Sequence, residues 1–353
     1  MGLKDRYVYI HQMKIRITGI ELAYVNALRR AIQADIANVA IDEQSVVFTQ
    51  NTTPLHNEFM SHRLSLVPFC VDLRELQSFS PDDYRFEINV TNAGAQARDV
   101  TSADITVNGG INRSFFPPSP ITGDYILLTV LQPYQSLHAT FRACKGYARD
   151  HARWSPVSNC VAFNAEDKQE VARQRKALLD TVGVDEARMN KFDTLDCQRI
   201  FHTNEHGGPD DFEFHIESEC RLLDTDIFKL GLTALTDRLR RVATEPFEVL
   251  PLSEDGEGAL FVATFRGESH TLGSVLQAYL HNTYIRKGAS VIDNCGYYVP
   301  HPLEPSVVMK LRFSKGKRDA ETAALFIKDA LEKASDKIES LFEKILSTYI
   351  NNK

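Results

Sequence analysis

Two histidines and a glutamate in this chain have the spacing of a zinc-protease motif. His202, Glu205 and His206 follow the order His-x-x-Glu-His, which on a helix presents two zinc ligands from one face. A Gly-Gly-Pro sequence comes directly after His206, and these residue types end helices. The sequence therefore favours a solvated loop over a protease site at this position.

Other residues capable of chemistry do not have the spacing of a catalytic or metal site. The aspartate pairs at 82–83 and 210–211 lie beside prolines, which favours surface turns over a magnesium site. Cys295 and His301 lack the companions that complete a zinc site, and the sequence has no phosphate-binding loop. We therefore expect no catalytic residue, no metal and no cofactor on this chain.

Composition restricts the class of protein further. The 353 residues suffice for two or three domains, and 43% hydrophobic with 25% charged residues is ordinary for soluble globular domains. A formal net charge of −7 argues against a protein whose main task is to bind nucleic-acid phosphates. There is no apolar run of membrane-spanning length, and residues 1–6 lack the apolar core of a signal peptide, so we expect no membrane span and no secretion signal. Six cysteines without a Cys-x-x-Cys pair indicate reduced thiols in the cytosol or nucleus.

The chain begins with a strand pattern followed by a helix pattern. Apolar and polar residues alternate over 13–18 and predict a strand that ends at Gly19. Three- and four-residue spacing then predicts a helix with Arg30 facing away from its apolar stripe. The stripe contains Val25, Leu28, Ile32, Ile36 and Val39.

A β-rich segment punctuated by prolines is predicted from about residue 45 to 163. A polar helix at about 166–181 and a strand at 212–218 follow, and they lead into a helix that contains Ile227 and Val242. Prolines, glycines and acids at 246–258 then predict a linker.

The opening pattern returns after this linker. A strand at 260–265 ends at Gly267, and a helix begins near Thr271. Aligning Gly19 with Gly267 without gaps places Leu28 opposite Leu276 and Ile32 opposite Leu280. The matching order of strand, glycine and helix indicates an internal repeat.

The second half ends with a strand at 307–313 and a helix from about Ala320. The apolar stripe of this helix contains Ile327, Leu331, Ala334, Ile338, Leu341, Ile345 and Tyr349. So long a stripe requires a partner, and we expect it to pack against the helix of Ile227 and Val242.

Several stretches of the sequence together resemble one protein family. Asn26-Ala27-Leu28-Arg29-Arg30 resembles a helix of the bacterial RNA polymerase alpha subunit and its archaeal and eukaryotic relatives. Three further stretches resemble the sequence around the inserted domain of that family: 51–54, His62–Pro68, and Lys145-Gly146 with His151–Val157, which includes Trp154. The stretches 268–273 and Cys295–Pro302 resemble the archaeal L subunit and the eukaryotic eleventh-subunit type.

The resemblance implies an α+β fold with two RNA-polymerase-alpha-like dimerisation modules in a pseudo-twofold pair. Residues 1–45 and 164–245 would form the larger module, which is similar to the archaeal D and eukaryotic third subunits, and 46–163 its β-rich insert. Residues 246–258 would link it to the smaller, L-like module at 259–353. Joining two subunits that are normally separate resembles the arrangement in large cytoplasmic DNA viruses of the asfarvirus type.

The function that the resemblance implies is that of a non-catalytic assembly subunit of DNA-directed RNA polymerase. Its expected partners are the largest and second-largest polymerase subunits and small zinc-binding subunits, and its two modules would pair with each other. The residues expected at partner interfaces are Asn26, Arg29, Arg30, His62, Arg63, Lys145, His151, Arg153 and Trp154. Those expected to pair the modules are Ile227, Leu235, Val242, His270, Leu272, Ile327, Leu331, Ile338, Leu341 and Ile345.

Some features depart from the family or leave an alternative open. Ser61 and Ser65 stand where the family usually carries alanine and glycine, and the insert has no cysteine cluster that would hold a metal. The alternative is a free-standing scaffold or DNA-binding transcription regulator, although the acidic charge argues against direct nucleic-acid binding. The expected location is intracellular: the host cytoplasm for a viral protein, otherwise the nucleus or cytoplasm.

Overall fold

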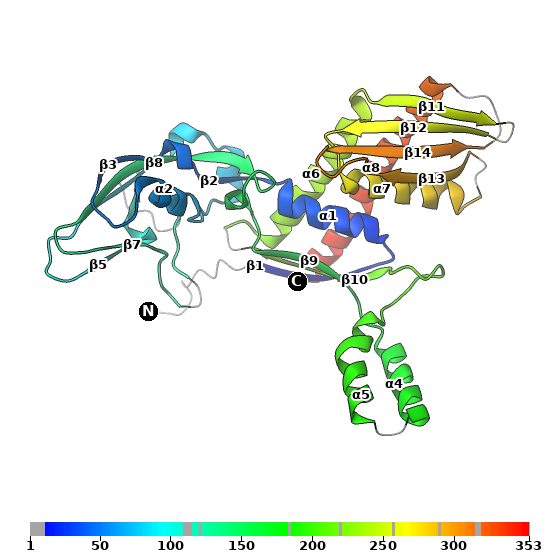
Figure 1. The fold of residues 1–353 in the computed structure, drawn as a ribbon, viewed down its shortest axis with the longest axis horizontal. Coiled ribbons are helices and arrows are strands. Elements are labelled where there is room, and N and C mark those ends of the chain that lie inside the picture. The colour runs from blue at the N-terminus through cyan, green and yellow to red at the C-terminus, as the bar shows by residue number, and fades with distance from the viewer. Residues whose placement is uncertain are drawn as a thin grey trace. The chain divides into compact units, whose positions relative to one another are not determined.

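The computed structural model describes residues 11–108, 115–119, 122–182, 185–218, 221–255, 258–288, 291–314 and 319–352. Its helices and sheets form an α+β fold, as predicted (Figure 1). The chain divides into two compact units. Unit 1 is built mainly from Ile32–Cys160 and Ile216–Gly231, and unit 2 from Lys14–Ala31, Val161–His215 and the chain from Leu232 onward.

The predicted internal repeat is present, and it extends to the order of strands in the sheets. The first copy comprises β1 (His11–Thr18), α1 (Leu22–Ala34), β9 (Asn159–Asn164), β10 (Asp211–Ser218) and α6 (Asp224–Thr244), with sheet order β1-β10-β9. The second comprises β12 (Gly258–Arg266), α7 (His270–Leu280), β13 (Ile292–Tyr298), β14 (Ser306–Phe313) and α8 (Ala320–Asn351), with sheet order β12-β14-β13. Each copy therefore runs strand, helix, edge strand, central strand, helix.

The two glycines that the sequence aligned occupy equivalent turns. Gly19 and Gly267 have φ of +70° and +76°, a conformation that side chains with a Cβ rarely adopt. The amide of Gly19 donates to the carbonyl of Asp210 at 2.7 Å, and that of Gly267 to Pro305 at 2.6 Å. Asp210 and Pro305 each precede the central strand of their sheet, so one hydrogen bond fixes the strand-to-helix turn in both copies.

Three local predictions were wrong. Helix α1 ends at Ala34, and the expected stripe positions Ile36 and Val39 lie beyond it, Val39 within β2 (Ala37–Ile41). This strand pairs with β8 (Ser136–Tyr147), and β-branched residues favour such a buried strand. The expected linker instead contains the strand β11 (Glu248–Asp255), which pairs with β12. Its Pro251 is tolerated because β11 is an edge strand.

The third correction concerns the stripe of α8. Phe342 and Leu346 are buried near its end, whereas Leu341, Ile345 and Tyr349 are half-buried. The predicted positions from Ile327 to Ile345 recur every seven residues, and a straight helix of 3.6 residues per turn drifts away from such a repeat. Ile327, Leu331, Ala334 and Ile338 are buried as predicted.

The segment expected to be a β-rich insert does contain two sheets. The larger has the order β2-β8-β4-β6, with β3 also paired to β8: β3 (Val47–Asn51), β4 (Arg85–Thr91) and β6 (Ile105–Val107). The smaller pairs β5 (Arg98–Thr101) with β7 (Leu127–Leu131), and the helices are α2 (Asn57–Ser65) and α3 (Leu73–Gln77). Phe69, Phe86 and Phe141 form an aromatic core with ring centroids 5.1–5.3 Å apart.

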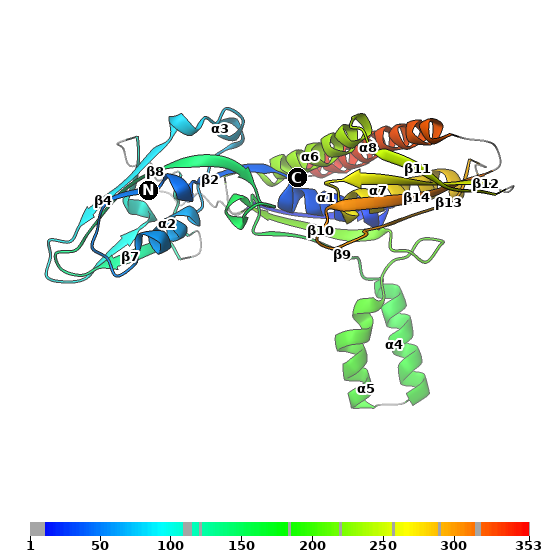
Figure 2. The ribbon, with the colours of Figure 1, turned by 45° about the horizontal axis from the view of Figure 1, so that its top comes forward.

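A pair of helices is inserted between β9 and β10. Helices α4 (Lys168–Val182) and α5 (Glu186–Lys191) lie side by side and extend from the ends of these strands (Figures 1 and 2). Among the described residues, no helix combines the length and apolar character needed to cross a membrane.

Candidate subunit interfaces

A buried glutamate joins the two copies of the repeat within unit 2. Glu268, whose side chain is 4% exposed, lies between the Gly267 turn and the start of α7. Arg238 of α6 donates to its Oε2 from Nε at 2.9 Å and approaches it with Nη2 at 2.7 Å. Arg241, one turn further along α6, approaches Oε1 at 3.5 Å. The carboxylate therefore holds α6 of the first copy against α7 of the second.

Helices α6 and α8 also contact each other in unit 2. The buried Ser335 donates from Oγ to the carbonyl of Thr236 at 3.3 Å. Arg240 of α6 pairs with Asp336 at 3.1 Å and with Glu339 of α8. The hydrogen bonds that Arg240 donates to the Glu339 and Asp336 carboxylates raise the pKa of its guanidinium.

Helices α1 and α7 form a third junction between the copies. Arg30 donates from Nε to Oγ1 of Thr271 at 2.8 Å, and Arg286 pairs with Glu21 at 3.3 Å. Arg30 was predicted to contact a partner subunit, yet this hydrogen bond is made within the chain. Arg29 donates from Nε and Nη2 to Oδ1 of the exposed Asn26 at 3.0 and 2.9 Å.

The residues expected to pair the modules differ in burial. His270 is exposed and packs its ring against Tyr297 with centroids 5.8 Å apart. Leu341 and Ile345 are half-buried. The others are buried: Ile227, Leu235, Val242, Leu272, Ile327, Leu331 and Ile338.

The remaining predicted interface residues belong to unit 1, and several lie together there. His62 of α2 and His151 have ring centroids 6.4 Å apart, and His151 lies at the same distance from Trp154. Trp154 donates from Nε1 to the carbonyl of Cys144 at 3.3 Å. Its indole covers Gly146, where a Cβ would lie 2.5 Å from the ring. Glycine at 146 is therefore required for the indole to pack.

Three charged residues of this group bind within the chain. Arg153 pairs with Glu43 at 2.6 Å, and its side chain is 10% exposed. Lys145 donates from Nζ to the carbonyl of Leu76 at 3.0 Å. Arg63 donates to the carbonyls of Leu127 and Leu128 at 2.8 and 2.9 Å. These contacts tie α2, α3 and the Trp154 segment to the insert sheets and fix the surface that they form.

Sequence reasoning missed an exposed apolar face on α2. Phe59 is 65% exposed and Leu66 is 47% exposed, and with His62 and Arg63 they have the 3- and 4-residue spacing of one helix face. Leu127, held beside α2 by Arg63, is also exposed. The sequence pattern that could have predicted this face is an apolar residue three positions before His62, Phe59, and another three positions after Arg63, Leu66.

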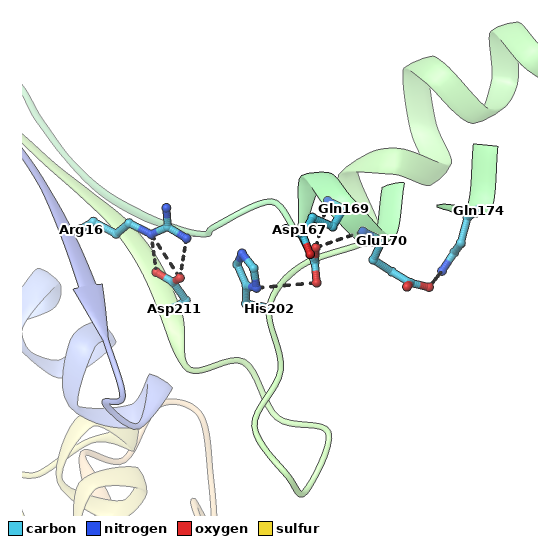
Figure 3. Close-up of polar contacts among 7 residues, drawn as sticks. All are labelled: Arg16, Asp167, Gln169, Glu170, Gln174, His202 and Asp211. Carbon is cyan, nitrogen blue, oxygen red and sulfur yellow. Dashed lines mark hydrogen bonds and ion pairs between the residues drawn. The ribbon is translucent and has the colours of Figure 1, made fainter. Parts of the chain in front are cut away.

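The His-x-x-Glu-His sequence is an irregular loop, as predicted. His202 lies with Nδ1 3.6 Å from Oδ2 of Asp167, whose Oδ1 accepts the amides of Gln169 and Glu170 and so caps α4 (Figure 3). Residues 203–208 follow in turns. Within the described ranges, no group of three or more His, Cys, Asp or Glu side chains is arranged to hold a metal ion.

The aspartate pair at 210–211 was wrongly expected to be a surface turn. Asp211 is buried at the start of β10, where Arg16 forks onto it with N–O distances of 2.6–3.1 Å (Figure 3). The hydrogen bond to Asp211 raises the pKa of Arg16. The ion pair between Arg16 and Asp211 thus joins β1 to β10. Cys220, one of the cysteines expected to be reduced, lies outside the described residues.

Family models match both copies of the repeat. The family model of the RNA polymerase Rpb3/Rpb11 dimerisation domain matches residues 14–239, and a second model of the same description matches 261–348. The chain is 30% identical over 247 residues to DNA-directed RNA polymerase subunit Rpo3 of Pyrococcus horikoshii, covering 65% of this chain and 91% of that protein.

Other relatives are matched over a smaller part of their length. DNA-directed RNA polymerase subunit Rpo3 of Aeropyrum pernix is 26% identical over 164 residues, which is 42% of this chain and 54% of that protein. DNA-directed RNA polymerases II, IV and V subunit 3 of Arabidopsis thaliana is 31% identical over 185 residues, 46% of this chain and 55% of that protein. The chain thus covers about half the length of these two relatives. With family matches on both copies of its repeated fold, the chain belongs to the RNA polymerase Rpb3/Rpb11 dimerisation-domain family.

Proposed function

We propose that this chain is a non-catalytic assembly subunit of a DNA-directed RNA polymerase that carries both halves of a dimerisation platform. The observation that carries the proposal is the repeat itself: two copies with the same strand order, each matched by a dimerisation-domain model. The two Rpo3 relatives described above are named as subunits of DNA-directed RNA polymerase. Catalysis would then be carried out by other subunits of the complex and not by this chain.

The two modules pair with each other in this proposal, as two separate subunits would. Support comes from the Glu268–Arg238 ion pair, the Ser335–Thr236 hydrogen bond and the Arg30–Thr271 hydrogen bond. Fusion makes this pairing intramolecular, and a short connection gives an effective concentration on the order of millimolar. Such a fused platform resembles the arrangement in large cytoplasmic DNA viruses of the asfarvirus type, and we propose the same arrangement here.

The strand pairings support adjusted module boundaries. Because β2 pairs with β8, and β9 belongs to the β1-β10-β9 sheet, we propose that the insert spans about residues 37–158. The smaller module would begin near residue 246, because β11 pairs with β12. The larger module then comprises the chain before the insert together with about 159–245.

We propose that unit 1 binds the second-largest polymerase subunit through the exposed face of α2. Phe59 and Leu66 supply apolar area, and His62 and Arg63 lie between them. Aromatic and arginine side chains in such a setting often dominate binding. The largest subunit and small zinc-binding subunits would join this platform afterwards.

Co-purification from a co-expression system tests the proposal. A tagged chain should capture the second-largest subunit, and the double variant Phe59→Glu with Leu66→Glu should reduce capture at least roughly tenfold while the circular dichroism spectrum stays unchanged. Tyr134→Glu, in the same unit and 85% exposed, is the matched control and should bind normally. Capture of no polymerase subunit by the folded wild-type chain would overturn the proposed function. Equal capture by the double variant would show that α2 is not part of the interface.

A further inference from the structure

One face of the four-stranded sheet in unit 2 carries apolar and basic side chains that are exposed (Leu250, Lys310) or half-buried (Leu260, Val262, Arg312). In the order β11-β12-β14-β13, the register aligns Leu250, Val262, Lys310 and Gly296 across the strands. The neighbouring row aligns Leu260, Arg312 and Asn294. The opposite face, with Phe261, Ala263, Met309 and Leu311, is buried, and α7 and α8 contact this sheet.

A groove of about 400 Å³ lies at the β13 side of the exposed face. Gly296 has no side chain there, and a Cβ built at this position would meet no atom within 4 Å. Lys310 lies opposite Gly296 in the register, with its Nζ 5.0 Å from the centroid of the Tyr298 ring. The groove is lined by Leu260, Asn294, Tyr298, Lys310 and Arg312 around the position left open by Gly296.

The side chains of the groove favour a ligand that carries a negatively charged group next to an apolar group. The exposed Lys310 supplies a cation to the groove, and half-buried Arg312 lies next to it on the same face of the strand. A carboxylate beside Lys310 would gain a charge-assisted hydrogen bond. Leu260, Val262 and Leu250 continue the surface towards β11 with apolar side chains. A nucleic acid would gain nothing from that apolar half, and the chain as a whole has a net charge of −7.

We propose that this groove is a docking site for an extended acidic segment of a partner protein, which places a carboxylate beside Lys310 and apolar side chains on Leu250 and Val262. The inference does not depend on the interface assigned to α2, which lies in unit 1. It also does not require an assembled polymerase, because every residue involved belongs to this chain.

Fluorescence anisotropy with the purified full chain tests the proposal. The probe is a short labelled peptide in which aspartate alternates with leucine and phenylalanine, and the comparison peptide carries lysine in place of aspartate. We expect the acidic peptide to bind and the basic peptide to bind at least roughly tenfold more weakly. The variant Lys310→Glu should weaken binding of the acidic peptide by a similar factor.

Gly296→Val provides a variant that blocks the groove without disturbing the fold. Its new side chain enters open space, and valine favours strands more than glycine does, so its thermal midpoint should equal or exceed that of the wild type while peptide binding is lost. Arg173→Glu, an exposed cation on α4, is the charge-matched control and should bind normally. No binding by the wild type, equal binding of both peptides, unchanged binding by Gly296→Val, or tighter binding of a single-stranded DNA oligonucleotide would each overturn the proposal.

Discussion

Replacing Glu268 by alanine should break the junction between α6 and α7. The Glu268 side chain is 4% exposed and that of Arg238 is 18% exposed, so truncation leaves a largely buried guanidinium without its carboxylate. Removing one partner of a buried ion pair costs about 3–5 kcal/mol. We expect the lower end of that range, about 3 kcal/mol, because water reaches part of Arg238. The loss should be confined to unit 2, which contains both residues.

A double-mutant cycle separates this pair from its surroundings. Glu268→Ala, Arg238→Ala and the double variant should give a coupling free energy of about 2 kcal/mol, within the range measured for contacting residues. Arg241→Ala is the matched control, since Arg241 approaches the same carboxylate at 3.5 Å but is 57% exposed. It should cost less than about 1 kcal/mol, as exposed ion pairs do.

The assay must report on unit 2 alone, because a chain of two units need not unfold in one step. Hydrogen exchange measured by mass spectrometry on peptides from α6 and α7 gives the local free energy of opening. Additive costs in the double variant, or equal costs for Glu268→Ala and Arg241→Ala, would refute the reasoning. So would an exchange change that appears in the insert sheets and leaves α6 and α7 unchanged.

Three further predictions follow from burial and packing. Phe342→Ala should cost about 3–5 kcal/mol of unfolding free energy because its ring is fully buried. Leu341→Ala, at a half-buried position, should cost less than half as much in urea unfolding, and the reverse ranking would favour the stripe that the sequence predicted through Leu341. Gly146→Ala should cost about 1–3 kcal/mol, since its Cβ overlaps the neighbouring indole, and unchanged tryptophan fluorescence and stability would contradict that packing. Burial raises the pKa of the Cys295 thiol to about 11, so iodoacetamide should label it slowly at pH 8 and faster as the pH approaches that value, because the thiolate is the reactive form. Mass spectrometry should show half-buried Cys197 labelled before Cys295, and rapid labelling of Cys295 at pH 8 in the folded chain would contradict its placement.

Local sequence patterns predicted most elements of the repeat, although not the edge strands β9 and β13. Alternation over residues 13–18 and 260–265 predicted β1 and β12, and the two aligned glycines predicted the turns that follow. These features are local, since the side-chain period of a strand and the left-handed φ of Gly19 and Gly267 depend on a few neighbouring residues. Motif resemblance added the family, which the matches to both copies bear out.

Tertiary structure decided what depends on residues far apart in the chain. The linker sequence at 246–258 became strand β11 because β12 offered a partner with open hydrogen-bonding groups. Arg30 could be recognised on its helix from periodicity, but its acceptor, Thr271, lies 241 residues away. Burial on α8 follows the sheet and helices that it contacts, so Phe342 is buried in place of Leu341. Local sequence cannot predict these outcomes, because each depends on the free energy of a contact with a residue that is distant in the sequence.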